Sequence, residues 1–406
     1  MSIDNSDPIP VTVLSGSLGA GKTTTLNHVL NTDHGLDAAV LVNDMGEVNV
    51  DADLVEQESD LSQDDEEVIE MSNGCICCRL RGDMLDEVGQ LAEDREFDYL
   101  LVESSGISEP IPVAQTFARG FEDADFDPTG VYELDTMVTV VDAHGIWQAF
   151  DSGTALTDDD VDPQGNRVPE EALMDQIEFC DVLLLNKCDL VPDDELDEIE
   201  AVLGALQPRA EIIRTEHGRV EPETILGTGR FDFDRVSQSA GWKQELQEGH
   251  HHEAAAEEHG VSSFVFEADR PFHPTRIESL LTELPDGIIR AKGFFWSAGR
   301  EDVAMGLDKA GQSVRAGPQG QWIATLPKQQ QERYFAARPG IKDDWDDQWG
   351  DRGVQLVFIG REYDEETLVG RLEATLLTDD EMDDSWAQYP DPFGVDEQAE
   401  LAIADD

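Results

Sequence analysis

The sequence predicts an α/β fold, with a mostly parallel sheet flanked by helices, followed by a smaller C-terminal α+β domain. Three observations predict it. Short apolar runs alternate with helix-like segments up to residue 235, a polar His-rich stretch follows, and strand-like and helix-like segments return in a different order after residue 261. A length of 406 residues suits two or three domains.

The first domain is expected over residues 1–237. Continuous apolar runs of four to six residues, separated by helical stretches, are typical of buried parallel strands with crossover helices. Two acidic, turn-rich stretches, 51–67 and 151–170, are expected to be surface insertions. The strand-like runs are VTVL (11–14), AAVLVN (38–43), YLLVE (99–103), MVTVVD (137–142) and DVLLLN (181–186).

A second, α+β domain is expected over residues 261–378, after a His-rich acidic linker at 238–260. Strands with helices packed on one face favour this class. Residues 328–352 look like a polar, Trp-containing insertion, and residues 379–406 like an acidic, frayed tail. The strand-like segments are 262–268, 288–299, 321–326 and 354–360, and the helix-like segments are 275–284 and 364–377.

The charge of the chain excludes several partners. Against 27 Lys+Arg stand 90 Asp+Glu, which gives a formal net charge of -63. Such a surface repels nucleic acids and anionic membranes, so we expect neither as a partner. Hydrophobic residues make up 39%, which argues against disorder. The acids are spread along the whole sequence and the cations are 20 Arg to 7 Lys, so the acidity indicates a salt-rich, halophile-like cytoplasm.

Cysteine usage predicts a reducing compartment. Three of the five cysteines fall within four residues, which suits a metal or redox site better than a disulfide framework. The N-terminal residues lack the basic and apolar regions of a signal peptide, and no run of about 20 apolar residues occurs. We therefore expect a soluble, cytoplasmic protein.

A phosphate-binding loop is predicted at residues 16–23, whose sequence GSLGAGKT fits GxxxxGK[ST] between a strand and a helix. Glycines let successive N–H groups point at phosphate oxygens, and the following helix adds its dipole. Lys22 is expected to bridge the β- and γ-phosphates, and the Thr23 hydroxyl to ligate Mg²⁺. The predicted nucleotide contacts in this loop are Gly16, Gly19, Gly21, Lys22, Thr23 and Thr24.

The run LLVESSG (100–106) supplies a second phosphate-side element at the end of an apolar strand. Glu103 is expected to hold Mg²⁺ directly or through water. Gly106 has no side chain to block its N–H from the γ-phosphate. We therefore place Glu103 and Gly106 with Lys22 and Thr23 in the catalytic group.

The nucleotide is predicted to be GTP from the sequence NKCD at 186–189, which ends another strand. Asp189 would accept two hydrogen bonds from guanine that adenine cannot offer, so ATP should be rejected. Lys187 would lie along the base plane, and Asn186 would brace the loop. Cys188 and Cys180 are interpreted as packing residues.

A thiol cluster lies between the phosphate loop and the Glu103 strand, in the sequence GCICCR at 74–79. Thiolates of Cys75, Cys77 and Cys78 can converge on one ion, most commonly Zn²⁺. Two arginines nearby, Arg79 and Arg81, would favour the thiolate form. Redox chemistry and buried structural thiols remain alternatives.

In this order the motifs resemble the CobW-type P-loop GTPases, relatives of the urease and hydrogenase nickel-insertion GTPases, over residues 11–377. The sequence RPFHP at 270–274 is similar to that family's C-terminal signature. The resemblance also implies that NDMGE (43–47) is the nucleotide-responsive switch. There Asp44 replaces the family's Glu, a carboxylate that can join the thiols as a metal ligand, and Glu47 is an alternative ligand or a residue on the Mg²⁺ side.

We expect from these features a GTP-hydrolysing metallochaperone that couples nucleotide state to transfer of a divalent metal, with zinc first and cobalt, iron or nickel open. A client metalloprotein would receive the ion. A zinc buffer or sensor without a client, cobalt delivery for cobalamin synthesis and an ATP-using kinase are the alternatives. No Gln follows Gly106, so no residue is assigned to position the attacking water. The linker histidines could also capture metal or could simply be part of a solvated polar linker; they are His250, His251, His252 and His259. Homo-oligomerisation is open.

Overall fold

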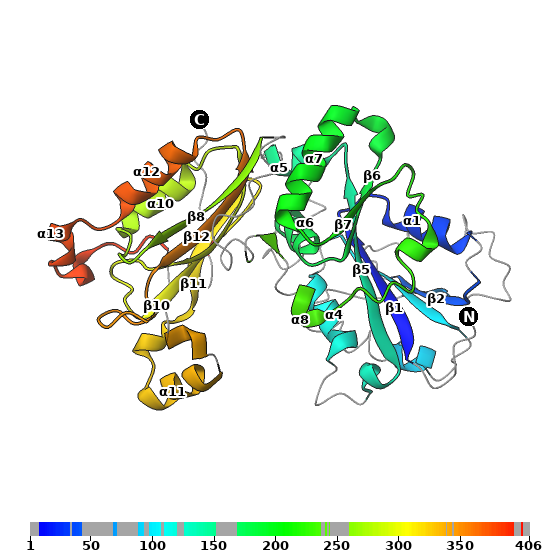
Figure 1. Ribbon diagram of the computed structural model, residues 1–406, viewed down its shortest axis with the longest axis horizontal. Coiled ribbons are helices and arrows are strands. Elements are labelled where there is room, and N and C mark those ends of the chain that lie inside the picture. Colours follow the sequence, from blue (N-terminus) through cyan, green and yellow to red (C-terminus); the bar gives the residue numbers. More distant parts are fainter. Residues whose placement is uncertain are drawn as a thin grey trace. The chain divides into compact units, whose positions relative to one another are not determined.

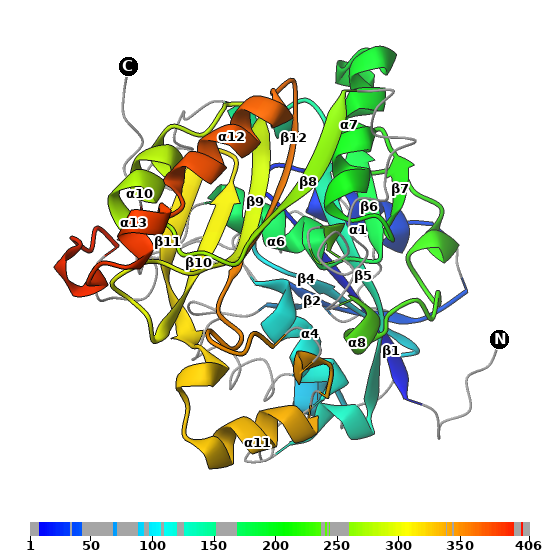
Figure 2. The ribbon, with the colours of Figure 1, turned by 60° about the vertical axis from the view of Figure 1, so that its left-hand side comes forward.

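The computed structural model describes the chain as two compact units (Figures 1 and 2). The first consists of Met1–Ala149 and Thr154–Gly241, and the second of Phe150–Gly153 and Trp242–Asp406. The residues that the structure describes are 8–32, 35–42, 68–70, 88–92, 97–106, 109–119, 126–151, 169–236, 240–241, 243, 260–337, 339–342, 345–393 and 399–400. The expected insertion at 51–67, most of the expected insertion at 151–170 and most of the expected linker at 238–260 lie outside them.

The first unit contains a seven-stranded sheet in the order β3-β2-β4-β1-β5-β6-β7, in which every neighbouring pair is parallel. This confirms the predicted α/β class. The strands are β1 (Ile9–Gly16), β2 (Ala38–Val42), β3 (Val68–Glu70), β4 (Tyr99–Glu103), β5 (Tyr132–Asp142), β6 (Val182–Asn186) and β7 (Glu211–Arg214). Its helices are α1 (Lys22–Leu30), α4 (Pro110–Ala118), α5 (Ile146–Asp151), α6 (Pro169–Glu178), α7 (Asp193–Leu206) and α8 (Phe233–Val236).

Burial on both faces explains why the strands are continuous apolar runs. Successive residues of a strand point to opposite faces, yet Leu183 and Leu184 of β6 are both fully buried. Leu184 belongs to the core cluster that includes Leu26 and Val29 of α1. Helices lie on both sides of the sheet in Figure 1. Because all the strands are parallel, the ends of β1, β4 and β6 lie at one edge of the sheet, where the predicted site residues follow.

The second unit contains a six-stranded sheet in the order β13-β11-β10-β9-β12-β8, with antiparallel neighbours. Helices α10 (Pro274–Thr282) and α12 (Glu365–Thr375) lie side by side on the sheet (Figure 2). Their apolar side chains, such as Leu280 and Leu372, form one core with Phe295 and Phe358 of the sheet. The strands are β8 (Val261–Ala268), β9 (Ile288–Phe295), β10 (Val303–Ala310), β11 (Ser313–Gln321), β12 (Val354–Arg361) and β13 (Ala399–Glu400).

One expected strand in this unit was wrong. Residues 321–326 were expected to be a strand, but Ile323–Thr325 form a 3-10 turn. The carboxylate of Asp351 accepts hydrogen bonds from the backbone N–H groups of Ile323 and Ala324, at 2.8 Å each, and so stabilises the start of this turn. The expected insertion at 328–352 contains helix α11 (Lys328–Ala337).

The segment that follows residue 379 is packed rather than frayed as far as Phe393. It contains helix α13 (Asp379–Met382), which begins with a capping box between Thr378 and Glu381. Trp386 is 5% exposed and Phe393 is fully buried. Acidic composition suggested a tail, but these two aromatic side chains bury enough apolar surface to hold the segment.

In the described part of the chain, no helix is long and apolar enough to span a bilayer.

Candidate functional site

The predicted phosphate loop connects the end of β1 to the start of α1. Gly16, Gly19 and Gly21 have φ angles of 139°, 75° and 105°, in the region that favours glycine. A Cβ on Gly16 would lie 2.2 Å from the carbonyl oxygen of Val140, and one on Gly21 would lie 2.3 Å from Nδ2 of Asn186. Any side chain at Gly16 or Gly21 would collide with these atoms, so the tight turn of the backbone requires glycine at both positions.

Lys22 is held across this loop. Its Nζ donates to the carbonyl oxygens of Gly16, at 2.9 Å, and Ser17, at 3.2 Å, and the residue is only 7% exposed. The ammonium group has three donors and no acceptor capacity. It is thus a buried positive charge positioned among the backbone groups of a phosphate-type loop.

Thr23 and Glu103, the two predicted magnesium residues, are in direct contact. The Thr23 hydroxyl donates to Oε1 of Glu103 at 2.9 Å, and Glu103 is 2% exposed at the end of β4. Strands β1 and β4 are in register with Leu14 opposite Glu103. A hydroxyl and a carboxylate are the oxygen ligands that Mg²⁺ prefers, so these side chains fit that ion.

Gly106 lies against the phosphate loop. A Cβ there would lie 2.9 Å from the backbone nitrogen of Leu18. The Nε2 of Gln176, a fully buried side chain of α6, donates to the Gly106 carbonyl oxygen at 3.2 Å. Sequence reasoning missed Gln176, because nothing in the α6 sequence ties it to the segment after β4.

Asn186, at the end of β6, joins three loops. Its Nδ2 donates to the Ala20 carbonyl oxygen of the phosphate loop at 2.8 Å. Its Oδ1 accepts from the Gly218 N–H at 2.9 Å and from the Thr215 hydroxyl at 3.1 Å. The side chain is 2% exposed. Asn186 therefore fixes the phosphate loop, the predicted base loop and the segment after β7 relative to one another.

The predicted base-reading side chains lie next to two residues that sequence reasoning missed. Lys187, at φ 63°, places its Nζ 2.7 Å from Oδ2 of Asp142, at the end of β5. Asp189 has its Oδ2 at 3.8 Å from Nε2 of His217. Asp142 could have been found, because it ends a predicted strand at the same sheet edge. His217 follows a short strand that no apolar run marks.

The predicted ligands of the transferred metal, as distinct from Mg²⁺, lie outside the described residues. They are Cys75, Cys77, Cys78 and Asp44, together with the switch at 43–47 and the linker histidines. Within the part of the chain that is described, no group of three or more His, Cys, Asp or Glu side chains could hold a metal.

The two described cysteines are packing residues. Burial raises the pKa of both the Cys180 and the Cys188 thiols above the usual value. Their Sγ atoms face the carbonyl oxygens of Ile177, at 3.2 Å, and Leu185, at 3.0 Å. Neither is poised as a thiolate ligand.

His273 of the RPFHP sequence is also structural. It is the N-cap residue of α10, and its ring packs 4.7 Å from that of Tyr389. Burial, and then the nearby Arg276, lower its pKa. These contacts place His273 in the packing of the second unit.

Two family models match the chain. The CobW/HypB/UreG nucleotide-binding domain matches residues 10–214, and the cobalamin synthesis protein cobW C-terminal domain matches residues 261–376. The motifs that carried the resemblance, from the phosphate loop to NKCD (16–189) and RPFHP (270–274), fall inside these matches.

Individual relatives are similar over most of the chain. The zinc-regulated GTPase metalloprotein activator 1 of Dictyostelium discoideum is 40% identical over 410 residues, covering 97% of this chain and 86% of that protein. The zinc chaperone YjiA of Escherichia coli strain K12 is 28% identical over 373 residues, covering 89% and 97%. The zinc chaperone CobW of a Sinorhizobium species is 28% identical over 302 residues, covering 71% and 82%.

The fold of both units, the phosphate loop of the first unit and the similarity to these relatives thus point to one family. The chain belongs to the CobW/HypB/UreG family of P-loop GTPases.

Proposed function

We propose that this GTPase is a metallochaperone in which the state of the bound guanine nucleotide controls a zinc site formed by Cys75, Cys77 and Cys78. The observation that carries the proposal is the register of three parallel strands. Val42 of β2 is paired with Glu70 of β3 on one side and with Glu103 of β4 on the other. All three residues therefore lie at the edge of the sheet where the phosphate loop lies.

Chain length limits how far Cys75 can lie from that edge. Neighbouring strands are about 4.8 Å apart, so the end of β3 lies roughly 10 Å from Glu103. Cys75 follows Glu70 by five residues, a stretch that spans at most about 18 Å. The segment 43–47 follows Val42, the last residue of β2, in the sequence. The strands that precede the proposed switch and the thiol cluster thus both end at the sheet edge that carries Glu103.

The nucleotide chemistry follows from the chain's own groups. The loop N–H groups and Lys22 would hold the β- and γ-phosphates, and Thr23 and Glu103 would exchange their mutual hydrogen bond for contacts to Mg²⁺. Asp189 would accept from guanine. Hydrolysis to GDP and phosphate then removes the γ-phosphate that orders the switch, with slow intrinsic turnover.

The names of the relatives support zinc as the ion and a metalloprotein as the recipient, because they describe two zinc chaperones and a zinc-regulated metalloprotein activator. We extend both properties to this chain. Deprotonated thiolates bind zinc strongly, so an ion held by three of them needs a trigger for release. Loss of the γ-phosphate would be that trigger.

Metal analysis of the reduced protein tests the proposal, with a non-hydrolysable GTP analogue and then with GDP. The double variant Cys77→Ser, Cys78→Ser should lose the bound zinc, whereas Cys188→Ser, which removes a thiol outside the cluster, should keep it. GTP turnover by the wild type should respond to zinc, and turnover by the double variant should not. Unchanged zinc content and turnover in the double variant would refute the coupling.

Delivery is separated from storage by a second measurement. Zinc-loaded protein is mixed with a zinc-free metalloenzyme, and recovery of that enzyme's activity is followed with GTP or with the analogue. Recovery that requires hydrolysable GTP indicates delivery. Recovery that is the same with GTP, with the analogue and with free zinc at equal concentration contradicts it.

A further inference from the structure

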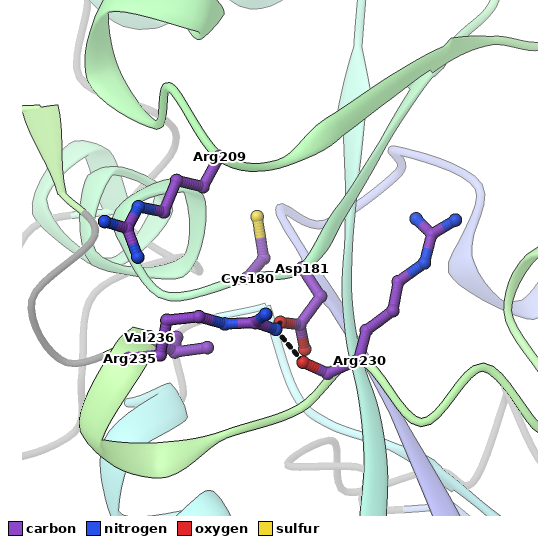
Figure 3. Close-up of a pocket in the computed structure, with 6 residues that line it drawn as sticks. All are labelled: Cys180, Asp181, Arg209, Arg230, Arg235 and Val236. Carbon is purple, nitrogen blue, oxygen red and sulfur yellow. Dashed lines mark hydrogen bonds and ion pairs between the residues drawn. The ribbon is translucent and has the colours of Figure 1, made fainter.

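A pocket lies at the edge of the first sheet opposite the nucleotide site. Its lining residues include Asp181, directly before β6, and Arg209, shortly before β7, so the pocket lies where these strands begin. The nucleotide-site residue Asn186 lies at the opposite end of β6. Its volume is about 390 Å³. Figure 3 shows its side chains, which are Cys180, Asp181, Arg209, Arg230, Arg235 and Val236.

The charge of this pocket is unusual for the chain. Three of only 27 Lys+Arg lie around one cavity of a protein with 90 Asp+Glu. Among the described residues, Arg209 makes no hydrogen bond or ion pair. Arg235 has the Asp181 carboxylate within ion-pair range, at 3.9 Å, and Arg230 pairs with Glu211. Among the described residues, Arg209 is thus the arginine of this pocket that has no carboxylate within ion-pair range.

The walls of the pocket are fixed before any ligand arrives. The Asp181 carboxylate accepts the Met137 N–H of β5 at 3.0 Å. The segment that carries Arg230 is tied to Asp135 of β5, whose carboxylate accepts the Gly229 N–H at 2.7 Å. A guanidinium of Arg235 donates to the backbone oxygen of Arg230. Groups that are held in place lose little entropy when they bind a ligand.

We propose that this pocket binds a small oxyanion with two or more negative charges, and that Arg209 and Arg235 are its ligands. Guanidinium groups present planar pairs of donors that match the oxygens of phosphate or carboxylate. The volume is in the range of small-molecule sites, about 300–1,000 Å³. None of the described lining residues is aromatic, so the anionic group, and not a ring, is what the pocket recognises.

Inorganic phosphate is the probe, titrated by calorimetry into protein that is saturated with Mg²⁺ and a non-hydrolysable GTP analogue. The analogue fills the phosphate loop, so phosphate cannot bind at Lys22. Potassium chloride keeps the ionic strength constant and screens contributions that depend on charge alone. Failure of this site leaves the proposed GTPase cycle untouched, because the analogue's own affinity is measured in the same protein.

Arg209→Gln is the informative variant, because Arg209 is exposed and its loss leaves no buried group unpaired. Arg333→Gln is the matched control, since it removes the same charge from an exposed position of α11 in the other unit. We expect phosphate to bind Arg333→Gln as it binds the wild type. A lost charged hydrogen bond should weaken binding to Arg209→Gln about tenfold or more.

The proposal is overturned if phosphate produces no more heat than chloride at equal ionic strength. Equal phosphate affinity of the two variants would also overturn it. Both variants must bind the GTP analogue as the wild type does, which shows that the first unit is folded.

Discussion

Replacing Asn186 by Ala should loosen the nucleotide site and destabilise the first unit together. The substitution leaves two buried backbone groups without partners, the Ala20 carbonyl oxygen and the Gly218 N–H. Each unpaired buried group costs about 1–3 kcal/mol, so the free energy of unfolding should fall by roughly 2–6 kcal/mol. The Thr215 hydroxyl also loses its acceptor but can rotate toward another.

Two measurements test this prediction. Urea unfolding, monitored by circular dichroism, reports the stability, and binding of a fluorescent guanine nucleotide reports the affinity. The affinity should fall by more than about tenfold, because the hydrogen bonds of Asn186 no longer connect the three loops. Thr215→Val is the graded control, since it removes one of the three hydrogen bonds and should cost about 1 kcal/mol. If Asn186→Ala were no more destabilised than Thr215→Val and bound the nucleotide normally, Asn186 would not be the tie between these loops.

Three further predictions concern two glycines and one buried carboxylate. Gly218→Ala should lower both stability, by about 1 kcal/mol or more, and nucleotide affinity, because φ is +66° and the new Cβ would lie 2.7 Å from the Thr25 nitrogen. Gly204→Ala should instead stabilise the first unit by about 0.5–1 kcal/mol, measured by thermal unfolding, because Gly204 lies within α7 and a Cβ there would meet open space. Burial raises the pKa of Asp181 to about 6, although Arg235 opposes this. The folded state therefore binds the Asp181 proton more tightly than the unfolded state, and this contribution to stability is lost as pH rises from about 4 to about 6. Asp181→Asn should exceed the wild type in stability by about 1–3 kcal/mol above pH 7 and by little at pH 4. A pH-independent difference in unfolding free energy between the two proteins would contradict this.

The first unit was predictable because its strands are buried on both faces, as Leu183 and Leu184 show. The hairpin of β10 and β11 was not, because VAMGLDKA and SVRAGPQGQ contain Gly, Pro and charged residues that resemble loops. The sequence signal that could have indicated the hairpin was the glycine at position 311, which adopts a φ of 55° in the turn between the two strands. Cross-strand pairing, not local propensity, stabilises this pair of strands.

The candidate site was predictable where its residues are contiguous in the sequence, as in the phosphate loop and NKCD. Its remaining parts come from distant segments. Asp142 approaches Lys187 from the neighbouring strand, and His217 approaches Asp189 from the loop after β7. Sheet order decides these contacts, and local pattern does not reveal which strand lies beside which.

The apolar side chains of the chain are divided between separate interiors. Among the described residues, no side chain belongs both to the core around Leu184 in the first unit and to the core around Phe358 in the second. Each sheet therefore has its own core, and a cavity introduced into one core leaves the packing within the other unchanged. The predicted nucleotide site lies in the first unit, so added guanine nucleotide should raise the temperature at which that unit unfolds in calorimetry.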